Sequence, residues 1–281
     1  KDNYVNIETT SNSDKIYGNF DAPLDVILKL CKKSIPEDGK DPGYFFYETK
    51  SGFKFKSISG LINSGIAKFE NDSYAEMHTY NYSGSINAKL KEEKGNDFKI
   101  LKPPLIQRDQ DQIAALKSGV YNVRICTLNT LTHEYTENVV NLLSSVNLGI
   151  KQESPIKSGE FNKSYTYLLN PGEKGDSNGG VSKTIMNNPA NYEPKANMRY
   201  SLLHSQLMQI QVPCNITLEA GDVIKVNLEN ITEDNKNEQI YNEHRSGFYL
   251  ILQLCHHFDS ANSFTSLLLA RDTYGLYRSK K

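Results

Sequence analysis

The last third of the chain contains short segments in which apolar and polar residues alternate, and this pattern restricts the fold more than any other feature. In QLMQIQVP (206–213), every second residue from Met208 to Val212 is apolar, and DVIKVNL (222–228) repeats the alternation after a run of turn residues. Side chains alternate between the two faces of a strand, so each segment has one face suited to a core. Several strands at this spacing predict a small antiparallel barrel or sandwich.

A hairpin is predicted in GFYLILQLCHHFDSANSFTSLLLARD (247–272). A four-residue loop at 259–262 places Leu254 opposite Leu267, and by extension Leu252 opposite Leu269. Gln253, Cys255 and His256 are then opposite Leu268, Ser266 and Thr265, and Ile251 is opposite Ala270. One face carries the leucines (250, 252, 254, 267 and 269) and is expected to pack in the core. The other face carries Gln253, Cys255, Ser266 and Asp272, and it is small and polar and can tolerate water.

Cys255, His256 and His257 are side by side and are all metal-ligand types. Neighbouring residues of a strand point to opposite faces, so the two histidines cannot ligate one ion without a bulge. Zinc requires three or four convergent ligands, and the sequence offers no second cluster to supply them. We therefore interpret these three residues as ordinary strand positions.

Other segments resemble sites only in part. The D-x-D spacing in RDQDQ (108–112) lacks the glycine and distal glutamate of a calcium loop, which favours the start of a helix. GDSNGG (175–180) neither follows a strand nor opens a helix, so it does not predict phosphate binding. Two pairs of acids are adjacent in the sequence: Glu92 with Glu93, and Glu233 with Asp234. Neither these pairs nor the His133–Glu134 pair places a base beside a nucleophile. The sequence predicts no catalytic residue, no cofactor-binding residue, no cofactor and no metal ligand, and hence no enzyme.

The remaining elements are expected upstream. They are a helix from Asp21 capped by that residue, an aromatic hairpin (44–47 and 53–55) around a turn at 50–52, a short helix at 57–63, a possible strand from Tyr74, a helix closed by Gly119, a strand from Val120, and a loop-rich insertion at 150–195.

The bulk composition excludes several classes of protein. The formal net charge is −1 with 23% charged residues, so no global basic field would hold nucleic acid or an anionic membrane. No apolar run approaches the roughly 20 residues that span a bilayer, so no membrane anchor is expected. The four cysteines are scattered and favour reduced thiols made in a cytoplasm. Residue 1 is lysine, and we interpret the chain as a piece of a longer protein.

Three stretches together resemble the baseplate hub proteins of contractile-tailed bacteriophages of the T-even type. They are DAPLDVILKL, then GYFFYETKSGFKFKSISGLI, and finally QLMQIQVPCNITLEAGDVIKVNL with the hairpin above; together they cover about 20–66 and 199–275. The matching positions are Tyr47, Glu48, Thr49, Gly52, Phe53, Ser57, Pro213, Leu218, Gly221, Asp222, Tyr249, His257, Arg271 and Asp272. The chain departs from the family at Cys214, where the family tends to have glycine.

The resemblance implies an α+β fold, mainly antiparallel β, with a tail-tube-type β-barrel domain and a smaller mixed α/β middle domain. It implies a linker at 1–19 from a missing upstream tube domain, the middle hub domain at 20–113, and the tube-type barrel at 114–281 with an insertion at about 140–198. It further implies a homotrimeric ring in the virion tail baseplate, assembled in the host cytoplasm, that joins the sixfold tail tube to the threefold central spike. The expected partners are other copies of the chain, the spike protein, tube or tube-initiator proteins and baseplate wedge proteins, with DNA passing through the lumen unbound. In such a ring we assign the polar face of the hairpin, with Gln253 and Cys255, to the lumen.

Three alternatives remain open on the sequence alone. A hub or spike component of a related contractile injection system would share these features, and neighbouring genes would separate it from a phage protein. A tail-associated peptidoglycan hydrolase would need a general acid near a second carboxylate, and a sugar-binding module would show clustered exposed aromatic residues. Neither feature is evident in the sequence.

Overall fold

The structure is a computed structural model that describes residues 4–12, 18–37, 42–82, 98–109, 111–130, 132–141, 160–169, 189–229, 242, 245–260 and 262–272. The described residues form two compact units. Unit 1 takes its residues from 1–59, 111–145 and 153–202, and unit 2 takes its residues mainly from 60–110 and 203–281. These units interleave along the chain, unlike the consecutive domains 20–113 and 114–281. The family-based domain boundaries stay a prediction.

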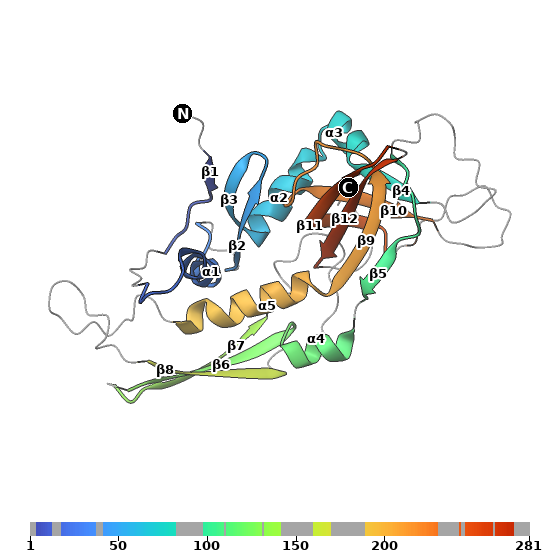
Figure 1. The fold of residues 1–281 in the computed structure, drawn as a ribbon. Helices are drawn as coiled ribbons and strands as arrows, with labels where there is room; N and C mark the ends of the chain where they lie inside the picture. The colour runs from blue at the N-terminus through green and yellow to red at the C-terminus, as the bar shows by residue number, and fades with distance from the viewer. Residues whose placement is uncertain are drawn as a thin grey trace. The chain divides into compact units, whose positions relative to one another are not determined.

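The elements of unit 1 form two three-stranded sheets with helices (Figure 1). They are β1 (Val5–Ile7), α1 (Pro23–Lys33), β2 (Tyr44–Thr49), β3 (Gly52–Ser57), α4 (Gln112–Ser118), β6 (Asn122–Asn129), β7 (Tyr135–Asn141), β8 (Lys163–Leu169), the 3-10 turn η4 (Pro189–Asn191) and α5 (Glu193–Leu203). Helix α2 (Ile58–Lys68) begins at the end of unit 1 and continues into unit 2.

Unit 2 contains one six-stranded sheet with the order β4-β10-β11-β12-β9-β5. Its elements are α3 (Asp72–Met77), β4 (Thr79–Tyr82), β5 (Leu105–Arg108), β9 (Gln206–Pro213), β10 (Val223–Leu228), β11 (Gly247–Phe258) and β12 (Ser263–Arg271). The four strands expected in the last third of the chain are all present. Most strand pairs of the two units are antiparallel, whereas β1–β3, β4–β10 and β6–β8 are parallel. The α+β class with mainly antiparallel strands is confirmed, and a tail-tube barrel stays a prediction.

The described strands of unit 2 share an apolar core on one face of their sheet. Tyr80 from β4, Ile210 from β9, Ile224 from β10, Ile251 from β11 and Leu267 from β12 all contribute to it, and each is at most 1% exposed. The segment after residue 98 adds Ile100 and runs between strands. Its backbone N–H groups at 100 and 101 donate to the carbonyls of Asn81 and Gln211 at 2.9 and 2.8 Å. The sheet therefore curves around its core. Among the described strands, β4 and β5 are its two edge strands.

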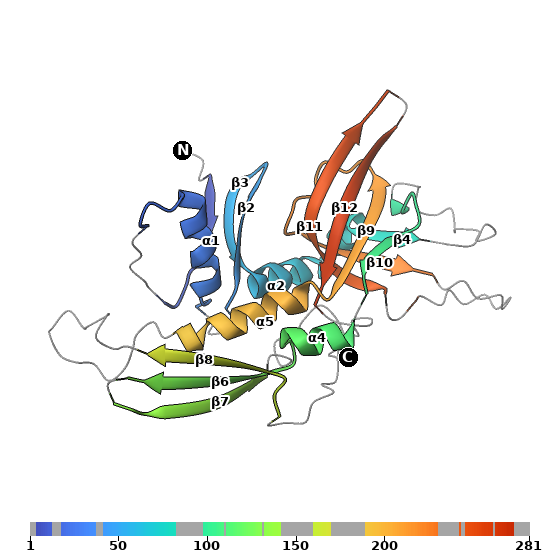
Figure 2. The same cartoon turned by 60° about the horizontal axis from the view of Figure 1, so that its bottom comes forward.

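The β11–β12 hairpin has the predicted loop but a different register at its base. Phe258 pairs with Ser263, and Leu254 pairs with Leu267, as the sequence indicates. A β-bulge at Leu252 then shifts the pairing, so that Ile251 is opposite Leu269 and Leu250 is opposite Ala270. The predicted pairs of Leu252 with Leu269 and of Ile251 with Ala270 are wrong because the bulge adds one residue to β11. Figure 2 shows the two long strands side by side.

The bulge also changes which residues reach the core. Ile251 and Leu254 face it from β11, whereas Leu252 is half-buried at the bulge. Gln253 and Cys255 are exposed, as expected for the polar face. Asp272 is only 2% exposed, so its assignment to a water-facing surface is wrong.

Several local predictions upstream are confirmed and two are corrected. The aromatic hairpin forms β2 and β3, and Gly119 closes α4 with a left-handed φ of 77°. Helix α1 begins at Pro23, but its N-cap is Ala22; Asp21 forms an ion pair with Lys29 and does not cap. The possible strand from Tyr74 is instead helix α3 followed by β4. Helix α3 forms because the side chain of Asn71 accepts hydrogen bonds from the N–H groups of the first turn.

In unit 1, the sheet β7-β6-β8 packs one face against η4 and α5. Val123 and Ile125 of β6 form a buried cluster there with Ala190 and Met198, and α5 lies along this sheet in Figure 2. The other sheet, β1-β3-β2, includes residues from the range expected to be a linker, because β1 pairs in parallel with β3. The predicted loop-rich insertion likewise contains β8 and the start of α5.

Candidate functional site

The side chains of Cys255, His256 and His257 lie apart in the structure. His256 lies on the core side of β11, where its Nδ1 is 2.9 Å from the hydroxyl of Thr265. Cys255 and His257 are exposed on the opposite face, and the His257 ring stacks on Phe264 with the ring centroids 4.6 Å apart. The three side chains do not converge. Within the described ranges, no group of three or more His, Cys, Asp or Glu residues is arranged to hold a metal ion.

The acids of the RDQDQ segment have separate structural partners. Asp111 is the N-cap of α4, and its carboxylate accepts from the N–H groups of Ile113 and Ala114 at 2.9 and 3.1 Å. Asp109 forms an ion pair with Arg245 at 3.1 Å. The interpretation of this segment as a helix start is therefore confirmed. Glu92, Glu93, 175–180, Glu233 and Asp234 lie outside the described residues.

His133 and Glu134 lie at the turn before β7. The alternation of the segment from Val120 predicts a strand here, and this is wrong: His133 has a left-handed φ of 56°, and the pair sits in a turn. Both residues are exposed.

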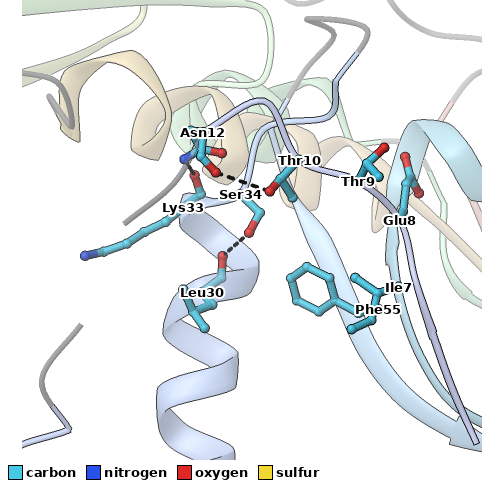
Figure 3. Close-up of a pocket in the computed structure, with 9 residues that line it drawn as sticks. All are labelled: Ile7, Glu8, Thr9, Thr10, Asn12, Leu30, Lys33, Ser34 and Phe55. Carbon is cyan, nitrogen blue, oxygen red and sulfur yellow. Dashed lines mark hydrogen bonds between the residues drawn. The ribbon is translucent and has the colours of Figure 1, made fainter. Parts of the chain in front are cut away.

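A pocket of about 340 Å³ lies in unit 1 where the N-terminal segment crosses β3 and the end of α1 (Figure 3). Its apolar side is formed by Ile7, Leu30 and Phe55. The Lys33 side chain extends away from these residues in Figure 3. The pocket thus has an apolar floor under a polar rim.

The polar groups of this rim are used to hold the N-terminal segment in place. The Glu8 carboxylate accepts from the N–H and the hydroxyl of Ser57 at 2.9 and 2.7 Å. The Asn12 side chain donates to the carbonyl of Lys33 and accepts from the N–H of Ile35, both at 2.9 Å. These contacts join the N-terminal segment to the end of β3 and to the end of α1, so the geometry fits a structural seam.

A second group of titratable residues, missed in the sequence, lies in unit 2 beside the turn that precedes β10. The rings of Tyr74 and His78 stack with centroids 3.8 Å apart, and His78 Nδ1 is 2.9 Å from the Tyr74 carbonyl. Lys68 forms an ion pair with Asp222 at 3.2 Å and lies 5.6 Å from the Tyr74 ring. Asp222 also accepts from the N–H of Glu219 at 3.0 Å, which fixes the turn. The i, i+4 spacing of Tyr74 and His78 was the available signal for a helical contact.

Burial lowers the pKa of His78 below its ordinary value of 6.5, and Lys68 acts in the same direction. The hydrogen bond to the Tyr74 carbonyl and the charge of Asp222 oppose this shift. Burial also raises the pKa of Tyr74. His78 is therefore neutral at pH 7 and part of a packed aromatic contact. The arrangement fits a structural role.

The pKa of His78 leads to a testable pH dependence. A histidine with a lowered folded pKa contributes stability that is present above pH 6.5 and is lost as pH falls through the folded pKa. His78→Asn removes this titration, so urea unfolding between pH 7 and pH 5 should show a smaller loss of stability than in the wild type. The exposed His257→Asn serves as the matched control and should retain the wild-type slope. Equal slopes for His78→Asn and wild type would contradict the prediction.

The comparisons with known proteins give weak likenesses only. No family model and no curated protein matches the chain. A tail protein from Neisseria meningitidis MC58 shares 10% identity at a TM-score of 0.37, over 82% of this chain and 50% of that one. The 43 kDa tail protein of prophage MuSo2 from Shewanella oneidensis shares 9% identity at a TM-score of 0.40, over 98% of this chain and 60% of that one. The chain thus spans half to three-fifths of the length of these proteins. TM-scores this low do not establish a shared fold, so the functional argument rests on the sequence resemblance and the described residues.

None of the helices in the described ranges has both the length and the apolar character needed to cross a membrane.

Proposed function

We propose that the chain is a structural protein of a phage tail and belongs to a baseplate hub of the T-even type. In this proposal three copies form a ring that joins the sixfold tail tube to the threefold spike and lets DNA pass. The single observation that carries it is the place in the fold of the C-terminal stretch that resembles the hub family. The strands that this stretch forms lie next to one another in one sheet, in the order β10-β11-β12-β9, and contribute to a shared core.

Three of the residues that match the family have structural roles in unit 2. Gly221 has a left-handed φ of 89° in the turn before β10, and Asp222 closes that turn. Tyr249 is fully buried, and its hydroxyl donates to the carbonyl of Arg245 at 2.6 Å. Matching residues with such roles support a likeness of fold and not of a catalytic site.

At Cys214, where the family tends to have glycine, the backbone does not adopt the positive φ that favours glycine. Asn19, Phe20 and His133 are the described non-glycine residues with positive φ, and Cys214 is not among them. The neighbouring Asn215 holds the turn, because its N–H donates to the Thr265 hydroxyl at 3.2 Å and its side chain donates to the Tyr80 hydroxyl at 3.1 Å. Replacing glycine by cysteine therefore does not weigh against the proposal.

A structural role also agrees with the charge of the chain. A protein with a net charge of −1 does not attract DNA phosphates strongly. A ring that conducts DNA must avoid such attraction, because bound phosphates would slow the passage of the DNA. The proposed partners are other copies of the chain, the spike, the tube or its initiator and wedge proteins, and the proposed location is the tail baseplate. We also propose that the protein is not an enzyme.

The oligomeric state of the full-length protein tests the proposal. Light scattering at several micromolar should give three times the protomer mass, and negative-stain electron microscopy should show rings with a central channel. Gln253→Glu should leave the trimer intact, because Gln253 is exposed on the face assigned to the lumen. A stable monomer at this concentration, or release of muropeptides from peptidoglycan that depends on a single carboxylate, would contradict the proposal.

A further inference from the structure

A larger pocket of about 640 Å³ lies in unit 1 between α1, β2, β8 and α5. It is open to solvent and does not share a lining residue with the pocket of Figure 3. Its walls combine apolar and aromatic side chains with two lysines. The residues used below are Leu28, Lys32, Phe45, Lys163, Tyr165 and Tyr200.

The aromatic wall is held in place by α5. The Tyr200 hydroxyl donates to the Tyr44 carbonyl at 2.5 Å, and its ring meets Phe45 edge-on with the centroids 5.5 Å apart. Burial raises the pKa of Tyr200, so this hydroxyl stays a donor at neutral pH. Burial likewise raises the pKa of Cys31 at the base of the pocket to about 11, which keeps the thiol protonated and unreactive. The wall is preformed, and its chemistry suits binding and not catalysis.

The charge of the pocket has one sign. Lys32 enters from α1 and Lys163 from β8, so the two ammonium groups come from different elements around the same opening. Lys163 lies 5.1 Å from the Tyr165 ring. No acidic residue lines the pocket in the part of the chain that the structure describes, and there neither lysine is paired with a carboxylate. Leu28 is 49% exposed at the rim, so the apolar wall continues onto the surface.

We propose that this pocket binds a segment of a partner polypeptide that carries aromatic side chains next to carboxylates. The aromatic side chains would pack on Phe45, Tyr165 and Leu28, and the carboxylates would pair with the two lysines. Small-molecule sites enclose roughly 70–90% of their ligand and aim convergent polar groups at it. This pocket is open, and its Tyr200 hydroxyl is already bonded to the protein. Anchor side chains of a chain that otherwise stays in solvent fit such a site better.

The proposal is tested by charge reversal with the full-length protein. The probes are two acetylated and amidated tetrapeptides that alternate phenylalanine with glutamate or with lysine, and their affinities are measured by titration calorimetry. The wild type should bind the acidic peptide roughly tenfold more tightly than the basic one, which corresponds to about 1.4 kcal/mol. Lys32→Glu with Lys163→Glu should reverse this order. Lys102→Glu, which makes the same charge change outside the pocket, should leave it unchanged.

Each other outcome has a defined meaning. Thermal melting checks that each variant is folded, and the exposed Lys32→Glu alone gives a test if the double variant is unstable. Absence of peptide binding up to millimolar concentration, or an equal effect of Lys102→Glu, overturns the proposal. Lysine-dependent binding of decanoate without binding of the acidic peptide also overturns it in favour of a small amphiphile. The test does not depend on the tail assignment, because a monomer can still bind the peptide and a trimer can fail to bind it.

Discussion

Replacing Leu267 with aspartate should leave the protein largely unfolded at room temperature. Leu267 is fully buried, and it pairs with Leu254 of β11 on one side and Ile210 of β9 on the other. An aspartate there would place a carboxylate in the apolar core of the six-stranded sheet, at a cost of several kcal/mol. Domains of this kind have total stabilities of about 5–15 kcal/mol, so the loss takes most of the margin. Circular dichroism with urea unfolding measures it.

The matched control for this variant is Leu252→Asp. The sequence pattern places Leu252 in the core opposite Leu269, whereas the structure places it half-buried at the β-bulge. A half-buried carboxylate keeps part of its hydration, so Leu252→Asp should cost clearly less free energy of unfolding than Leu267→Asp. If Leu252→Asp proves the more damaging change, the bulge is misplaced and the uninterrupted leucine ladder is correct.

The same hairpin shows what the sequence can and cannot predict. Alternation located β11 and β12, and the short polar run at 259–262 located the loop between them. The extra residue at Leu252 was not predictable, because a bulge built from an apolar residue leaves the composition of the strand unchanged. One inserted residue moves every side chain beyond it to the other face. The error therefore extended from Leu252 to all pairs at the base of the hairpin.

Helix α3 illustrates a second limit. Tyr74, Glu76, His78 and Tyr80 alternate with other residues, which is the pattern of a strand, and only the last of them lies in β4. The helix is decided by the Asn71 side chain, which caps its first turn. This capping signal competes with the alternation of residues that is typical of a strand. Parallel pairs such as β4 with β10 join segments 146 residues apart, and local patterns carry no information about them.

The candidate sites divide in the same way. Local reasoning was sufficient for the two histidines of the hairpin, since strand geometry alone separates them. It was also sufficient for Asp111, because a helix start has a local signature. The contact of Lys68 with Asp222 arises from tertiary packing, and so does the pocket of unit 1 that Lys32 and Lys163 line. No spacing of residues in the sequence indicates either of them.

Replacing Gly65 with alanine should destabilise the protein by about 1–3 kcal/mol, because the position has no room for a side chain. Gly65 is buried in α2, and a Cβ atom there would lie 2.7 Å from the Cβ of Val223, with the Cγ2 of Val223 nearer still. Val223 is fully buried at the start of β10 and cannot turn away without disturbing its own contacts. Helix propensity acts in the opposite direction, since alanine in place of glycine stabilises an exposed helix by about 1 kcal/mol.

The sign of the change in unfolding free energy therefore decides whether α2 and β10 pack this closely. Ser64→Ala, at the exposed neighbouring position of the same helix, is the control and should stay within about 0.5 kcal/mol of wild type. Val223→Ala removes the nearest methyl group, so the Gly65→Ala, Val223→Ala double variant should lose less stability than the two single losses added together. Stabilisation by Gly65→Ala, or strict additivity in this cycle, would show that the helix and the strand are not in direct contact at Gly65.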